Sequence, residues 1–172
     1  MRGKASAFSV IESEVPLMEW VFDDGGRKDA GYKGFTGDCA CRACAIVTGR
    51  PYKEVYDLIN ELAKSERKGK RKTSVSSART GVYSGTMKKV MAHYGFKWVP
   101  TMHIGSGCTV HLNADELPSG KIVCLVSKHY VSVIDGVIHD TYDSSIAIRF
   151  HNDASLAETD RCVYGYFVEE VK

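Results

Sequence analysis

Two consecutive residues, Asp135 and Gly136, constrain the fold of this chain more than any other feature of its sequence. They separate two runs of alternating apolar residues, and Asp-Gly between such runs is the strongest short-range signal for a two-residue β-hairpin turn. If this pair forms the turn, Ile134 lies opposite Val137, and the numbers of any two opposite residues add up to 271. The sequence therefore predicts two antiparallel strands and also which of their residues face each other.

The predicted register brings a histidine and an aspartate together. Val131 lies opposite Asp140, so His129 becomes the diagonal neighbour of Asp140 on the same face. A carboxylate beside an imidazole fixes its tautomer and stabilises the imidazolium, as a general base requires. A one-residue bulge would bring Asp143 opposite His129 instead, and Asp143 is therefore the alternative partner. Taken alone, His129 is also compatible with an ordinary surface histidine at the start of a strand.

A second candidate site lies around Cys39. Asp38 is a suitable N-cap and Gly49 a suitable C-terminal stop for a helix, which places Cys39 in the first helical turn. The free N–H groups and the dipole of a helix N-terminus stabilise a thiolate, and the amide of Cys39 could donate a hydrogen bond to an oxyanion. The adjacent Asp38 carboxylate opposes the thiolate unless capping engages it. The alternative is that Cys39 is simply a small buried residue.

Five further cysteines are interpreted as packing residues: Cys41, Cys44, Cys108, Cys124 and Cys162. The chain shows no secretory signal, so we expect a cytoplasmic protein, in which disulfides would be reduced. Cys41 and Cys44 form a Cys-x-x-Cys pair, but no second pair follows it, so we expect no metal site.

The organisation of the chain indicates an α+β fold in a single domain, residues 1–172, of which 44% are hydrophobic. Turn residues separate a helical first half from a strand-rich second half. Helices are predicted at 38–48, 51–64 and 84–95. Strands are predicted at 96–99, 108–112, 121–126, 130–134, 137–141, 146–150 and 162–168. We expect the helices to pack against a mainly antiparallel sheet.

The net charge of +2 is too small to make the whole molecule bind nucleic acid or a membrane surface, and the longest apolar runs are far shorter than a membrane span. The charge is nevertheless uneven. Residues 64–79 carry seven Lys or Arg and one Glu, which gives +6 there and −4 elsewhere. We expect a flexible, solvated loop at about 64–80 and no nucleic-acid site, because the segment has no aromatic residue for base stacking.

The chain order Cys39, His129, Asp140 resembles that of the papain-like cysteine peptidases, especially the compact bacterial and phage-type branch that includes the peptidases removing double-glycine leaders from bacteriocins. The resemblance implies a papain-like fold with the nucleophile helix packed on the sheet, no cofactor, and a peptide or protein substrate. It implies that Cys39 is the nucleophile, His129 the general base and then acid, and Asp140 the orienting group, in hydrolysis of a peptide or isopeptide bond.

One position departs from the family pattern. Papain-like enzymes usually carry a Gln six residues before the nucleophile to complete the oxyanion hole, but here that residue is Lys33, and the chain has no Gln. The second oxyanion donor would then be Lys33, Thr36 or a backbone amide. Two other functions stay open: a non-catalytic binding module whose basic loop binds an acidic partner, and an acyltransferase related to transglutaminases or arylamine acetyltransferases.

Overall fold

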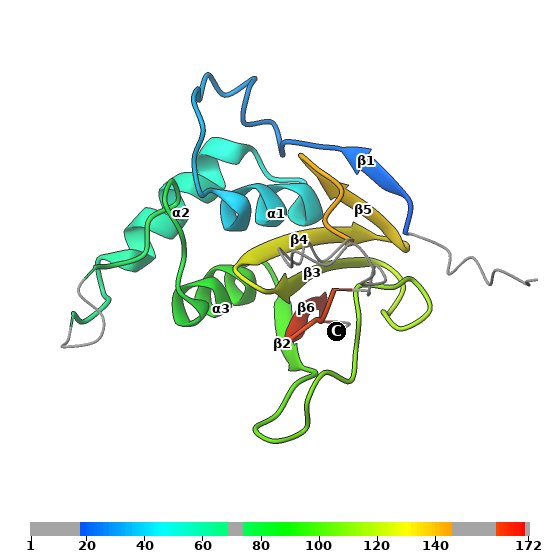
Figure 1. Cartoon of the computed structure of the whole chain (residues 1–172). Coiled ribbons are helices and arrows are strands. Elements are labelled where there is room, and N and C mark those ends of the chain that lie inside the picture. Colours follow the sequence, from blue (N-terminus) through cyan, green and yellow to red (C-terminus); the bar gives the residue numbers. More distant parts are fainter. Residues whose placement is uncertain (1–17, 69–73, 146–160, 171–172) are drawn as a thin grey trace, which may run out of the picture.

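The computed structural model of the chain describes residues 18–68, 74–145 and 161–170 (Figure 1). The described part is an α+β structure, as predicted. Its helices are α1 (Cys39–Thr48), α2 (Tyr52–Ala63) and α3 (Ser84–His93). Its strands are β1 (Trp20–Phe22), β2 (Phe96–Pro100), β3 (Lys121–Val126), β4 (His129–Ile134), β5 (Val137–Asp140) and β6 (Gly165–Glu169). Within the same residues, no helix is long and apolar enough to cross a bilayer.

Local signals place the helix ends within a few residues of the predicted positions. Gly49 ends α1 in the left-handed conformation, with a φ of 65°, which glycine adopts without steric cost. Pro51 immediately precedes α2, where its missing N–H costs nothing. The chain leaves α3 through Gly95, which also has a positive φ of 84°. The three predicted helices are therefore confirmed.

The strands form one six-stranded sheet in the order β1-β5-β4-β3-β6-β2. β1 runs parallel to β5, and the other neighbouring strands are antiparallel. The sheet is therefore mixed, with β1 as a parallel edge strand that the sequence did not predict. A strand of three residues is too short to show the alternation that reveals strands in a sequence.

The hairpin of β4 and β5 has the predicted register. Ile134 lies opposite Val137 and Ser132 opposite His139, with Asp135 at φ 49° and Gly136 at φ 81° in the turn. Positive φ at both turn residues is what a two-residue hairpin with the native strand twist requires, and Asp-Gly supplies it at low cost. This prediction is confirmed because hairpin register is a local property.

The central strands β3 and β4 are buried on both faces of the sheet. On one face, α1 packs across β4 and β3, with α2 and α3 beside it (Figure 1). This helix-side core contains residues such as Val47, Ile59 and Met87. The opposite face is covered by the long connection between β2 and β3 and by the segment before β6, which contribute Leu112 and Val163. Burial of both faces holds the β4–β5 hairpin against the N-terminal end of α1.

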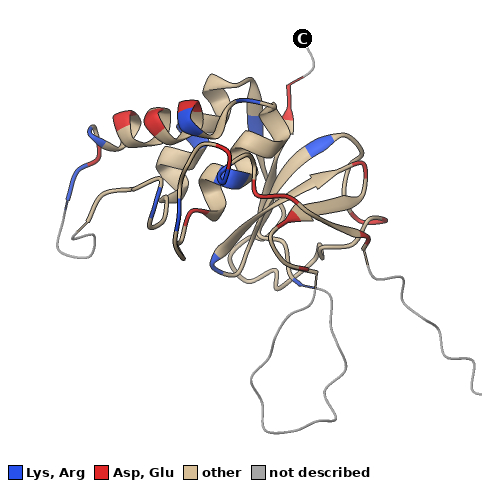
Figure 2. Ribbon diagram, turned by 90° about the horizontal axis from the view of Figure 1, so that it is seen from above, with Lys and Arg blue, Asp and Glu red and all other residues tan. Residues whose placement is uncertain are grey.

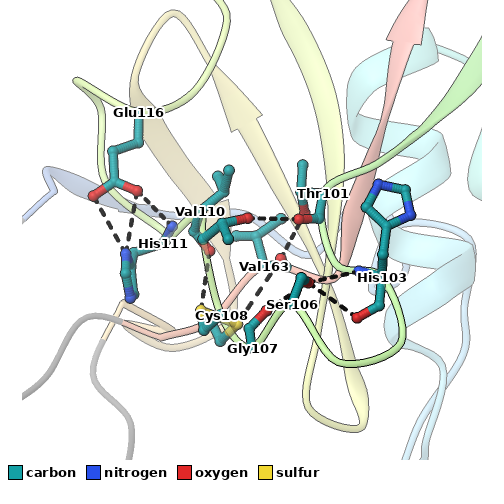
Figure 3. The surroundings of a disulfide bond; sticks show 11 residues. Thr101, His103, Ser106, Gly107, Cys108, Val110, His111, Glu116 and Val163 are labelled. Carbon is teal, nitrogen blue, oxygen red and sulfur yellow. Dashed lines mark hydrogen bonds and ion pairs between the residues drawn. A yellow bond between two sulfur atoms is a disulfide. The ribbon is translucent and has the colours of Figure 1, made fainter.

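The cysteine interpretation is wrong for two residues, because Cys108 and Cys162 form a disulfide with a Cα–Cα distance of 5.8 Å (Figure 3). Cys162 is only partly buried, so the apolar residues after it did not indicate an inert core thiol. The predicted strand 108–112 is also wrong: only an isolated bridge joins His111 to Cys162 there. The strand predicted at 162–168 begins later, at Gly165, and the one predicted at 146–150 lies outside the described residues.

The basic segment is anchored at its C-terminal end. Residues 64–68 continue from the outer end of α2, away from the sheet (Figures 1 and 2), and residues 69–73 lie outside the described part. Beyond them, the Ala78 amide donates to the side chain of Asn60 at 3.0 Å, and the Ser76 amide donates to Glu66 at 3.0 Å. Ala78 is fully buried. Within residues 74–79, which lead into α3, Ser76 and Ala78 are therefore buried, whereas Ser74, Val75 and Arg79 are exposed, and the flexible loop expected at about 64–80 stays a prediction.

Candidate active site

Cys39 and His129 meet where α1 begins and β4 begins. Both side chains line the same cleft, and hydrogen bonding and charge from His129 and the backbone of Tyr130 act on the pKa of the Cys39 thiol. Cys39 is the first residue of α1, so its sulfur also lies at the positive end of the helix dipole. The two candidates are 90 positions apart in the sequence, and packing of α1 on β4 brings them together. Local sequence patterns do not predict this packing.

The surroundings of Cys39 favour its thiolate. Burial raises the pKa of the Cys39 thiol, but the hydrogen bond and the charge of His129 oppose this effect. The backbone hydrogen bond from Tyr130 and the charge of Arg42 act in the same direction as His129. The pKa of Cys39 is therefore lowered from the ordinary value of 9.0. A lowered pKa at a partly accessible sulfur is the setting of a reactive cysteine.

His129 is held from its other side by Asp140. The Nε2 atom of His129 lies 2.6 Å from Oδ2 of Asp140, and both residues are buried. Because Nε2 is engaged by Asp140, Nδ1 is the ring nitrogen left for the Cys39 sulfur. Burial lowers the pKa of His129, but the hydrogen bonds and charges of Asp140 and Cys39 raise it to about 8. The imidazolium is therefore favoured beside the thiolate.

The structure brings Asp140 to His129, and not the alternative Asp143. Asp143 accepts hydrogen bonds from the amide and hydroxyl of Ser145, at 3.0 and 2.7 Å. Asp140 accepts from the Thr141 amide at 2.7 Å through Oδ1 and from the Ser144 hydroxyl at 3.2 Å through Oδ2. The paired part of the β4–β5 hairpin, from Ser132–His139 to Ile134–Val137, contains no bulge.

Asp38 does not oppose the thiolate as an isolated charge. Its side chain makes no capping hydrogen bond to α1. Instead, its carboxylate lies 2.8 Å from Nε of Arg27 and 3.1 Å from Nε of Arg42, and the Tyr52 hydroxyl donates to it at 2.6 Å. Two guanidinium groups therefore compensate the buried carboxylate beside Cys39. The sequence signal that could have found Arg42 is its i, i+4 spacing from Asp38 on one helix.

The candidate residues open onto a cleft of about 590 Å³. The segment before α1 and the loop before α3 both contribute to its walls. The ring of Tyr142 packs against His129 in a tilted arrangement, with a centroid distance of 5.1 Å. The lining residues are Phe35, Thr36, Gly37, Cys39, Arg42, Thr80, Gly81, Val82, Tyr83, Ser84, Leu125, Lys128, His129, Tyr130, Thr141 and Tyr142. A substrate can therefore reach Cys39 from solvent.

The other free cysteines differ from Cys39. Cys41, Cys44 and Cys124 are completely buried. Burial raises the pKa of all three thiols, to about 12 for Cys44. Within the described part of the chain, no group of three or more His, Cys, Asp or Glu side chains could hold a metal ion. Of the four free thiols, Cys39 is the one set up to react.

The two side chains considered as second oxyanion donors differ in their position relative to the cleft. The Thr36 hydroxyl is shielded from solvent, although the residue lines the cleft, and it has no hydrogen-bond partner among the described residues. Lys33 does not line the cleft, and its carbonyl accepts a hydrogen bond from Arg27 at 3.1 Å. Beside the Cys39 amide at the helix N-terminus, Thr36 or a second backbone amide therefore stays the expected second donor.

Comparisons of the chain with protein-family models, with curated proteins and with solved structures found no match. The function must therefore be inferred from the chemistry of the site. Three features bear on it: a partly accessible thiol of lowered pKa, a histidine that lines the same cleft, and a buried carboxylate bonded to that histidine.

Proposed function

We propose that this protein is a cysteine hydrolase that cleaves a peptide or isopeptide bond, with Cys39 as nucleophile, His129 as general acid and base, and Asp140 as the orienting group. One observation carries the proposal. Cys39, at the N-terminus of α1, lines one cleft with His129, which lowers the pKa of the Cys39 thiol and whose Nε2 lies 2.6 Å from Asp140. A papain-like fold is part of the proposal, and the packing of α1 on β4 supports it.

The chemistry follows from the protonation states. The Cys39 thiolate attacks the carbonyl carbon of the amide, and a C–S bond forms while the carbonyl π electrons move to oxygen. When the tetrahedral intermediate collapses, the C–N bond breaks and the His129 imidazolium gives its proton to the leaving amine. His129 then takes a proton from water as the water attacks the thioester. The C–S bond breaks, the carboxylic acid leaves, and the thiolate and imidazolium are restored.

Asp140 supports both steps without changing its own charge. Its hydrogen bond to Nε2 leaves Nδ1 directed to the sulfur and stabilises the imidazolium that must persist until the amine departs. The amide of Cys39, at the free N-terminus of α1, is the candidate donor to the oxyanion. Tyr142 covers one side of the imidazole and limits access of water to it.

Acyl transfer is the second candidate function, because the same geometry would form the same thioester. Whether water or an amine attacks the thioester decides between hydrolysis and transfer. The cleft is open to solvent at Cys39, which favours water.

The cytoplasmic location stays a prediction. The observation that weighs against it is the disulfide between Cys108 and Cys162, because cytosolic thiols are normally kept reduced. Cys39 would remain usable in an oxidising compartment, since the other free thiols are buried and Cys39 has no accessible partner among them.

The proposal is tested with a peptide library digested in water enriched in oxygen-18. The wild-type protein is expected to generate new C-termini that carry the heavy isotope, whereas Cys39→Ala generates none. Cys44→Ala, which removes a buried thiol of the same helix, serves as the control and is expected to cleave like the wild type. Cleavage by Cys39→Ala would overturn the proposal, and adducts formed with an added amine in place of labelled carboxylates would favour acyl transfer.

A further inference from the structure

Arg42 is the side chain that contacts both halves of the candidate site. It lies on α1, three residues after Cys39, and is mostly buried, with 12% of its side chain exposed. Its Nε lies 3.1 Å from Asp38 Oδ1, at the start of α1. Its Nη1 lies 3.5 Å from Asp140 Oδ1 and also donates to the Thr141 hydroxyl, at the end of β5. One planar group therefore links the nucleophile helix to the strand that carries Asp140.

The charges around this link are balanced. Asp38 and Asp140 have side chains only 4% and 6% exposed, and two arginines compensate them. Arg27 contacts Asp38. Arg42 contacts both carboxylates, and no other Lys or Arg pairs with Asp140 among the described residues. A buried charge that loses its partner is costly, so Asp140 depends on Arg42 in a way that Asp38 does not.

The two oxygens of Asp140 have different partners. Oδ1 accepts hydrogen bonds from Arg42 and the Thr141 amide. Oδ2 contacts His129 and accepts from the Ser144 hydroxyl. With Oδ1 fixed, the carboxylate cannot turn away from the imidazole. A lysine in place of Arg42 would keep a positive charge but lose the planar fork that spans two acceptors at once.

We propose that Arg42 is a positioning residue of this site, which holds the Asp140 carboxylate in the orientation that bonds Nε2 of His129 and thereby keeps Nδ1 directed to Cys39. This inference rests on the proposed function for its catalytic meaning, but the orientation itself can be measured without a substrate. Arg42 has this role through Asp140 and is not expected to touch the substrate's reacting bond.

The first readout is the imidazole N–H proton of His129 in NMR spectra of the folded protein. A short hydrogen bond to a buried carboxylate gives this proton a strongly downfield signal, which His129→Gln identifies by its loss. The signal is expected to be lost or shifted upfield in Arg42→Met. It is expected to persist in Arg27→Met, which removes the other arginine of Asp38 and leaves the contacts of Asp140 in place. Arg42→Met is compared only after its thermal unfolding confirms that it is folded.

The second readout is turnover of a peptide cleaved by the wild type. Arg42→Lys retains a cation and is the variant used if Arg42→Met does not fold. The kcat of the Arg42 variant is expected to fall by on the order of 10²-fold with KM little changed, because a small displacement of catalytic groups lowers the reaction rate by about that factor. Arg42 variants that keep both the His129 signal and the wild-type kcat would overturn the inference. A wild type that shows the His129 signal but no Cys39-dependent cleavage would instead overturn the proposed function.

Discussion

Nε2 of His129 lies 2.6 Å from Oδ2 of Asp140, and the two residues face each other diagonally across the hairpin of β4 and β5. Asp135 and Gly136, at the turn, set the register on which this contact depends. Inserting one residue between Asp140 and the turn would move the carboxylate to the opposite face of the strand. The contact between acid and base is thus encoded in a short stretch of sequence, whereas the contact of His129 with Cys39 is not.

The state of Cys39 predicts selective alkylation. Iodoacetamide at pH 7 is expected to modify Cys39 faster than Cys41, Cys44 or Cys124, because its pKa is lowered and it is partly accessible, whereas the others are buried. Site-resolved mass spectrometry of briefly labelled, folded protein measures this. His129→Gln is expected to slow labelling of Cys39, and His139→Gln, on the opposite face of the same hairpin, is the matched control. Equal labelling rates of all four thiols would contradict the prediction.

The pair of shifted pKa values predicts a bell-shaped pH profile of kcat/KM. Below the lowered pKa of Cys39 the thiolate is protonated, and above about 8 the His129 imidazolium loses the proton that the leaving amine needs. Activity is therefore expected to decline as the pH rises above about 8. A profile that keeps rising to pH 10, as for an isolated thiol, would exclude the thiolate–imidazolium pair.

We expect Asp140→Asn to lose activity and Asp143→Asn to retain it. Removing the charge lowers the pKa of His129 and leaves its tautomer unfixed, so kcat is expected to fall by on the order of 10²-fold. Within the described part of the chain, Asp143 hydrogen-bonds only to Ser145, so its amide variant leaves His129 as it is. Steady-state cleavage of one peptide by both variants measures the difference. The reverse ranking would restore Asp143 as the orienting group.

His129 also predicts a pH dependence of stability. Its folded-state pKa of about 8 lies above the usual 6.5, so the folded protein binds this proton more tightly than the unfolded chain does. The resulting stabilisation, about 2 kcal/mol from the size of that shift, is complete below pH 6.5 and is lost as the pH rises through about 8. Urea unfolding from pH 6 to 9 is expected to show a steeper loss of stability in His139→Gln than in His129→Gln. Parallel curves would refute this contribution.

The disulfide predicts a thiol count. Under denaturing, non-reducing conditions, a thiol reagent is expected to detect four free thiols, and six after reduction, because Cys108 and Cys162 are joined. The bond spans 54 residues of chain, so replacing both cysteines by Ala is expected to lower the free energy of unfolding by about 4 kcal/mol. Six free thiols in protein purified without reductant would show that this bond does not form.

Several features could be predicted because their causes are local. The hairpin register follows from Asp135 and Gly136, and the end of α1 follows from Gly49. Strand β1 and the disulfide could not be predicted, because each pairs residues far apart in the chain and neither leaves a periodic signal. Prediction of the strand at 108–112 failed for a related reason. Its residues are tied to Cys162 by the disulfide and a single bridge, and among the described residues no strand pairs with them along their length.

The sequence by itself determined the α+β class, the three helices and the placement of His129 beside Asp140, since helix ends and hairpin register depend on neighbours along the chain. Only the tertiary structure decided that Cys39 meets His129, because that contact requires α1 to pack on β4. It also decided how the Asp38 charge is compensated: Arg27, from the segment before α1, and Arg42 converge on it. Burial makes these distant partners necessary, because a carboxylate removed from water must find its countercharge wherever the fold supplies one.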